Sequence, residues 1–160
     1  MWISIDSQSS IDRLLHEFAG FHDACLREVS IATETYVAEN LAMSCPGHLD
    51  TSALLFLQGQ NRSLPAIEIK CERVTGIRVN PTPDNCDSIL AGGNITTDGK
   101  TYRLALNFMG GPLTGPPNSW VSIQKKPYTE SDIEVTAESI AWRPVENGLG
   151  KHLRYRQSKS

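Results

Sequence analysis

A chain of 160 residues with 39% hydrophobic and 21% charged residues is long enough to bury a core without disulfides or a metal ion. Its formal net charge is −3, and no apolar run approaches the roughly 20 residues that cross a bilayer. These features argue against a disordered chain and against a membrane-spanning one. The amino terminus lacks a basic and apolar leader, which predicts a cytoplasmic protein.

The charge is distributed unevenly along the chain. From Arg143 onward five basic residues stand against Glu146 alone, so this part carries +4 and the preceding part −7. No hydrophobic period continues beyond Pro144. We therefore expect a single domain over residues 1–145 and a basic flexible tail over residues 146–160.

One helix is expected, from Ser7 to Gly20. Ser9 or Ser10 can cap it, and its apolar residues fall in one narrow sector at 3.6 residues per turn. These residues are Ile11, Leu14, Leu15 and Phe18. The helix should therefore lay one apolar stripe on a sheet.

Three strand candidates follow the helix. They are predicted over Cys25–Ala38, Thr51–Gln58 and Ala66–Val79, where apolar and polar residues alternate or where apolar residues run together. In the third, Arg73 falls on the apolar side and Gly76 interrupts the pattern. A bulge or bend is expected there.

The clearest local pattern is a hairpin over Ile89–Phe108. Asp98 and Gly99 separate two alternating runs, and this dipeptide favours a two-residue type I′ turn. With that loop Ile95 would face Tyr102. The alternation predicts an antiparallel pair of strands with one buried face.

After the hairpin we expect an irregular loop over Gly110–Asn118 and two more strands, Ser119–Lys125 and Ile133–Arg143. The last strand changes parity between Val135 and Ile140, which indicates another bulge. No second helix is available for a parallel crossover. The predicted fold class is therefore α+β, a mainly antiparallel curved sheet of about seven strands with one N-terminal helix packed on it.

No pattern indicates catalytic, cofactor-binding or metal-binding residues. The four histidines lack ligand spacing, the four cysteines form no C-x-x-C pair, and no G-x-S-x-G or phosphate-binding glycine pattern occurs. We therefore assign no catalytic residue, no cofactor and no metal.

The residues proposed for ligand or partner contact are His22, Asp23, Tyr102 and Trp120. His22 and Asp23 stand at the junction of the predicted helix and first strand. Because adjacent residues of an extended segment point to opposite faces, the two are not expected to pair with each other. A turn cap at Asp23 and a packed His22 are the structural alternative.

The order of a helix, Phe21-His22-Asp23-Ala24 and the amphipathic strand Leu26–Ile31 resembles a group of small bacterial proteins with a His-Asp-Ala motif. Some members of that group look like immunity proteins of bacterial toxin systems. The resemblance implies a protein that binds and blocks a partner toxin without catalysis.

Two functions of different classes follow. We favour a non-enzymatic protein-binding module, of the immunity type, whose acidic body suits a basic protein partner. The alternative is a small-ligand-binding protein or a hydrolytic enzyme with a site near His22 at the mouth of the rolled sheet, lined by Tyr102 or Trp120. An open sheet edge would favour a homodimer. Nucleic-acid binding is not expected, because the acidic body repels a polyanion.

Overall fold

The computed structural model describes residues 1–82, 87–109, 131–151 and 153–155. In these ranges it has one α-helix, one short 3-10 helix and nine strands. The helices are α1 (Gln8–Glu17) and η1 (Ala19–Phe21). The strands are β1 (Ile3–Ile5), β2 (Ala24–Ala32), β3 (Tyr36–Val37), β4 (Met43–Ser44), β5 (Ser52–Gly59), β6 (Ala66–Val79), β7 (Ile89–Thr97), β8 (Tyr102–Phe108) and β9 (Ile133–Pro144).

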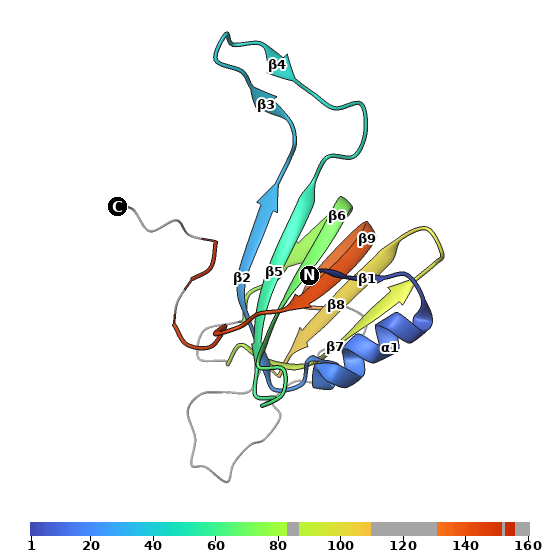
Figure 1. Cartoon of the computed structure of the whole chain (residues 1–160), viewed down its shortest axis with the longest axis vertical. Helices are drawn as coiled ribbons and strands as arrows, with labels where there is room; N and C mark the ends of the chain where they lie inside the picture. Colours follow the sequence, from blue (N-terminus) through green and yellow to red (C-terminus); the bar gives the residue numbers. More distant parts are fainter. Residues whose placement is uncertain (83–86, 110–130, 152, 156–160) are drawn as a thin grey trace.

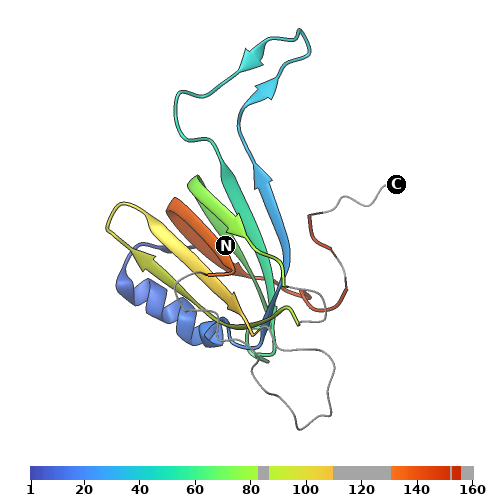
Figure 2. The same cartoon turned by 180° about the vertical axis from the view of Figure 1, so that it is seen from behind.

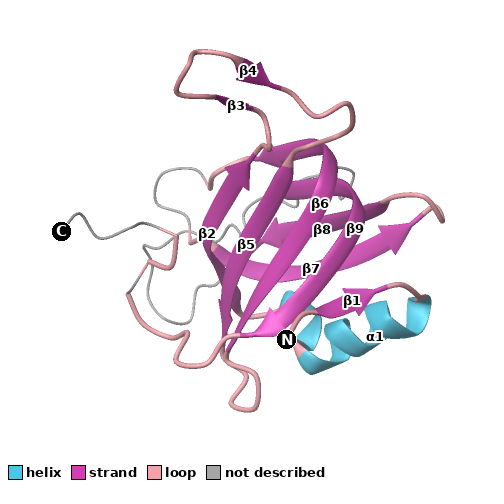
Figure 3. Cartoon of the chain, turned by 45° about the horizontal axis from the view of Figure 1, so that its top comes forward, coloured by secondary structure: helices cyan, strands magenta, loops and turns pink. Residues whose placement is uncertain are grey.

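Seven of these strands form one antiparallel sheet that closes on itself. Its order is β1-β9-β6-β5-β2-β7-β8, and β8 also pairs with β9, which completes the ring (Figures 1 and 3). The junction of β2 with β7 is short, since only Ala24 and Cys25 find partners there. The predicted α+β class, with a mainly antiparallel curved sheet and an N-terminal helix, is confirmed.

The sheet bends sharply where β6 and β9 are irregular together. The register of this pair shifts between Val74 and Gly76, and Arg73 has a φ of +51°. On β9 the buried residues change parity between Ala137 and Ile140, and at the same place β9 exchanges β8 for β1 as its neighbour. The bulge or bend predicted near Gly76 is confirmed. It lies where β9, paired with β6 along its length, stops pairing with β8 and begins to pair with β1.

Helix α1 lies beside β1 and β7 (Figure 3). Ser7 caps it through a reciprocal bond with Ser10, so the cap lies two or three residues before the predicted positions. Three of the four predicted apolar residues, Ile11, Leu14 and Phe18, are fully buried. The helix ends earlier than predicted because the backbone turns at η1.

The hairpin of β7 and β8 is present, but its predicted register is wrong by two residues. Ile95 pairs with Leu104 rather than with Tyr102. The Asp98 carboxylate accepts the backbone N–H groups of Lys100 at 2.8 Å and Thr101 at 2.7 Å, which stabilises a four-residue turn. Since a shift of two preserves the side-chain faces, Ile95, Leu104 and Leu106 are still buried.

Several features of the fold were not predicted, among them β1, β4 and the closure of the sheet. Strand β1 is too short to show a period, and the predicted strand Cys25–Ala38 is divided into β2 and β3 by residues 33–35. The predicted loop Gly110–Asn118 and strand Ser119–Lys125 lie outside the described residues.

Candidate interaction site

His22 and Asp23 lie on the surface between η1 and β2. The Nδ1 atom of His22 is 3.0 Å from the Asp23 carboxylate, and both side chains are about half exposed. The prediction that they do not pair is wrong because it assumed an extended backbone, whereas Asp23 has a φ of +56°. The pair is formed locally, and no other predicted site residue joins it.

Tyr102 lies at the other end of the sheet from this pair. The backbone N–H of Asp23 donates to Leu90, and Leu90 pairs with Phe108. Tyr102 is six residues farther along β8, roughly 20 Å away at 3.3 Å per residue. Trp120 lies outside the described residues. The four predicted contact residues are therefore not brought together in the part of the chain that the structure describes.

The interior of the ring is filled with side chains. Its largest fully buried residues include Trp142, Phe21, Leu55, Leu57, Ile67 and Leu104. Phe18 and Phe21 meet edge to face with ring centroids 5.7 Å apart. A site at the mouth of the rolled sheet, near His22, thus has a packed core beneath it.

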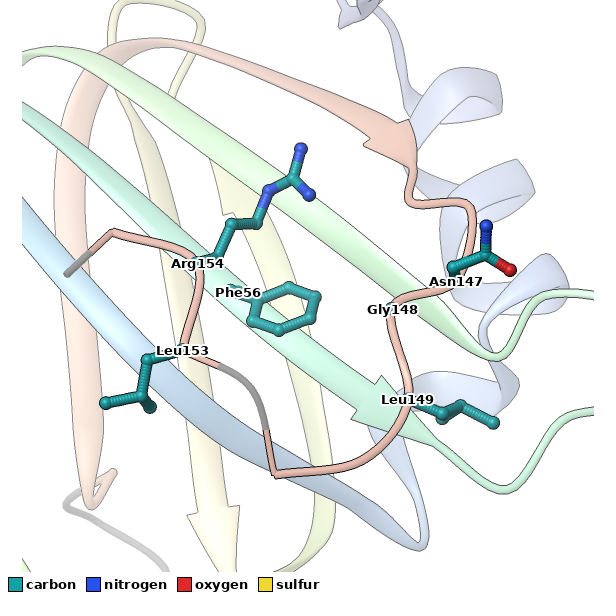
Figure 4. A pocket seen from close by; sticks show the side chains of 6 residues that line it. All are labelled: Phe56, Asn147, Gly148, Leu149, Leu153 and Arg154. Carbon is teal, nitrogen blue, oxygen red and sulfur yellow. The ribbon is translucent and has the colours of Figure 1, made fainter. Parts of the chain in front are cut away.

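A hollow of about 130 Å³ lies instead on the outer face, between Phe56 and the chain that follows β9 (Figure 4). We call residues 145–151 and 153–155 the C-terminal segment. Gln58 donates to the carbonyl groups of Gly148 at 2.6 Å and Gly150 at 3.0 Å. These bonds hold the segment across β5.

A carboxylate buried on this outer face, Glu68, also holds the segment. Glu68 lies 2.6 Å from a guanidinium nitrogen of Arg143 and 3.0 Å from Nε of Arg154. Burial favours its neutral form, but the nearby Tyr155 side chain and the hydrogen bonds from Arg143 and Arg154 outweigh that effect and lower the pKa of Glu68. Glu28 on β2 accepts the backbone N–H groups of Arg154 and Tyr155. The part of the expected tail that the structure describes is thus attached to the sheet.

The most exposed apolar surface lies on a long projection between β2 and β5. We call residues 33–51, which include β3 and β4, the arm; it extends well beyond the rest of the described chain (Figures 1 and 2). Eleven large apolar side chains are exposed among the described residues, and six of them lie between residues 31 and 49. These six are Ile31, Tyr36, Val37, Leu41, Met43 and Leu49. Such a concentration is typical of an interaction surface.

The arm is also the acidic part of the molecule. From residue 28 to residue 61 the chain has four acidic residues, Glu28, Glu34, Glu39 and Asp50, and neither Lys nor Arg. This stretch therefore carries −4, slightly more than half of the −7 that precedes Arg143, and its four acids have no Lys or Arg among them.

Sequence reasoning missed the arm because its apolar residues do not alternate as a strand or recur as a helix. Two signals could have revealed it. One is the absence of Lys and Arg over residues 28–61. The other is the turn-forming Pro46-Gly47, which stands among apolar residues that follow neither a strand nor a helix period.

No group of three or more metal-binding side chains is assembled among the described residues. No helix in the same ranges is long and apolar enough to cross a membrane. The chain matches no protein-family model, no curated protein and no solved structure.

Proposed function

We propose that the protein is a non-enzymatic protein-binding module that contacts its partner through the arm. The observation that supports this is the gathering of exposed apolar side chains on a projection that contributes little to the core. Exposed apolar groups of this size bind another apolar surface favourably in water.

The charge of the arm favours a basic partner. Glu34, Glu39 and Asp50 lie in the same segment as the exposed apolar residues, and neither Lys nor Arg occurs between residues 28 and 61. Opposite charges around an apolar contact accelerate association and exclude wrong partners. Within this class, the resemblance at Phe21–Ala24 favours an inhibitor that blocks a toxin by binding it.

No observation favours the alternative of a ligand-binding or hydrolytic site. His22 and Tyr102 stand at opposite ends of the sheet, and the core fills the space between them.

The proposal is tested by shortening the arm. Ala32 and Ser52 face each other across the β2–β5 pair, so an Asn-Gly turn in place of residues 33–51 can close a plain hairpin. Tagged full-length and shortened proteins are used to recover partners from the native host, and the affinity of each recovered protein is then measured by titration calorimetry. We expect the shortened protein to bind at least about a hundredfold more weakly, because the central apolar contacts carry most of the binding energy.

A partner that binds the two proteins equally would refute the role of the arm. Failure to recover any partner with the full-length chain would refute the binding function itself.

A further inference from the structure

The exposed apolar side chains of the arm lie on both of its faces. Tyr36 pairs with Ser44, and Val37 pairs with Met43. Since successive residues of a strand point to opposite faces, Tyr36 occupies one face, and Val37 with Met43 occupies the other. Tyr36 and Val37 are each 60% exposed and Met43 is 71% exposed.

The tip of the arm exposes an apolar side chain as well. Leu41, which is 83% exposed, lies in a tight turn closed by bonds between Ala38 and Ala42 and between Leu41 and Ala38. Asn40 accepts the backbone N–H of Ala42 and completes the turn. A flat partner could cover one face of the arm, but it would leave the other face and the tip in water.

The base of the arm is held in shape by its own polar contacts. The Asp50 carboxylate accepts the hydroxyl of Thr35 at 2.6 Å and its backbone N–H at 3.1 Å. These bonds lower the pKa of Asp50, so it is charged at neutral pH. The Nε2 atom of His48 lies 3.5 Å from the carboxylate of Glu34, which joins the two chain segments at the base of the arm. A projection ordered before binding loses less conformational entropy when it is enclosed.

We propose that the partner is a protein with a cleft that encloses the arm, with apolar walls against both faces and Lys or Arg side chains toward Glu34, Glu39 and Asp50. This inference rests on the proposed function and specifies the partner of the same surface. Only enclosure covers Tyr36, Met43 and Leu41 at once.

Photo-crosslinking from opposite faces tests the enclosure. Benzoylphenylalanine replaces Tyr36 in one protein and Met43 in another, each is irradiated in lysate of the native host, and the crosslinked peptides are mapped by mass spectrometry. We expect both positions to crosslink to one protein, at peptides that contain Lys or Arg. Benzoylphenylalanine at Lys100, on the exposed β7–β8 turn, is the matched control and should not label that protein.

The outcomes separate the two proposals. Crosslinking from one face alone would overturn the enclosure and leave the arm as a flat contact. Crosslinking from neither face would overturn both the enclosure and the binding role of the arm.

Serine substitutions then measure how much each face of the arm contributes to the affinity for the crosslinked protein. Tyr36→Ser and the double change Val37→Ser with Met43→Ser should each weaken binding at least about tenfold. Because these side chains are exposed, neither change should alter the melting temperature. If only one of the two variants binds the partner more weakly, the partner contacts a single face of the arm and the contact is flat.

Discussion

Gly93 lies where β7 passes closest to η1. A Cβ atom at this position would lie 2.5 Å from Leu106 Cδ2 and 2.9 Å from both the Phe21 ring and the carbonyl of Ala105. The structure thus shows close packing at this glycine. The identity of the neighbour could not be predicted, because Phe21 reaches β7 only through the left-handed backbone of η1.

Substitution Gly93→Ala should therefore lower the free energy of unfolding by about 1–3 kcal/mol, as over-packing in a core does. Urea denaturation followed by circular dichroism measures the loss. The control is Gly76→Ala, since no heavy atom lies within 4 Å of a Cβ there. Equal effects of the two changes would contradict the packing role of Gly93.

Glu68 is the buried charge of the outer face, and its lowered pKa makes stability depend on pH. A carboxyl group whose pKa is lower in the folded than in the unfolded state stabilises the fold above its ordinary value of 4.5. That contribution is lost as the pH falls through the folded-state pKa. The carboxylate was predictable as one residue of the polar face of a strand, but its two arginine partners come from distant parts of the chain.

We expect Glu68→Gln to lower the free energy of unfolding at pH 7 by about 1–3 kcal/mol, the range for hydrogen bonds to charged groups. The difference from the wild-type protein should shrink between pH 7 and pH 3, as measured by denaturation at each pH. Glu138→Gln removes the exposed partner of Arg73 and should cost under about 1 kcal/mol. A pH-independent difference at Glu68 would indicate a loss of packing rather than of charge.

At the scale of elements, periodic stretches were predictable and connections were not. The bounds of β6 agree with the prediction at both ends, because 14 residues of alternation leave little ambiguity. The β7–β8 turn was predicted with the wrong length, because the Asp98 side chain competes with the two-residue turn that Asp-Gly favours. The arm was not predicted, because its apolar residues follow no strand or helix period and are exposed rather than buried.

The C-terminal segment gives a prediction at the same scale. Its Leu149 and Leu153 are exposed, so between Val145 and Tyr155, which pack on Phe56 and Ala66, polar contacts such as Arg154–Glu68 hold the segment. Glu68 keeps Arg143 as a partner when Arg154 is removed. Arg154→Ala should accelerate amide hydrogen exchange in residues 147–155 roughly tenfold, the equivalent of one charged hydrogen bond.

Lys151→Ala is the matched control for this change. It removes the same charge from the same segment, yet in the described part of the chain Lys151 is bonded through its backbone carbonyl, which accepts from Arg27 and is kept by the substitution. Equal exchange in the two variants would show that net charge, rather than the Arg154–Glu68 pair, holds the segment.

For the whole molecule, the antiparallel α+β class followed from the count of strands and the single helix. Closure of the sheet did not, because it depends on the pairing of β8 with β9, whose registers no local pattern fixes. The distribution of charge along the chain is also not evident from the overall composition. A net charge of −3 suggests a mildly acidic surface throughout, whereas residues 28–61 alone carry −4 and the part from Arg143 onward carries +4.

The shortened protein, with Asn-Gly in place of residues 33–51, should fold as stably as the full chain. None of the fully buried core residues lies in the arm, so we expect the melting temperature to change by less than about 5 °C. Scanning calorimetry of both proteins measures this. A larger fall would mean that the arm supports the body and that a loss of binding on shortening has a second cause.

The pairing of β1 constrains how the protein can be made. Strand β1 leaves the ribosome before the other described strands, and its ladder partner is β9, the last of the described strands to be synthesised. Because β6 and β8 also pair with β9, the ring cannot close before β9 has been made, and the β1–β9 pairs join residues 135 to 139 positions apart, which slows folding. Nascent chains stalled before residue 133 should be digested by protease throughout, and resistance should arise only after β9 has emerged.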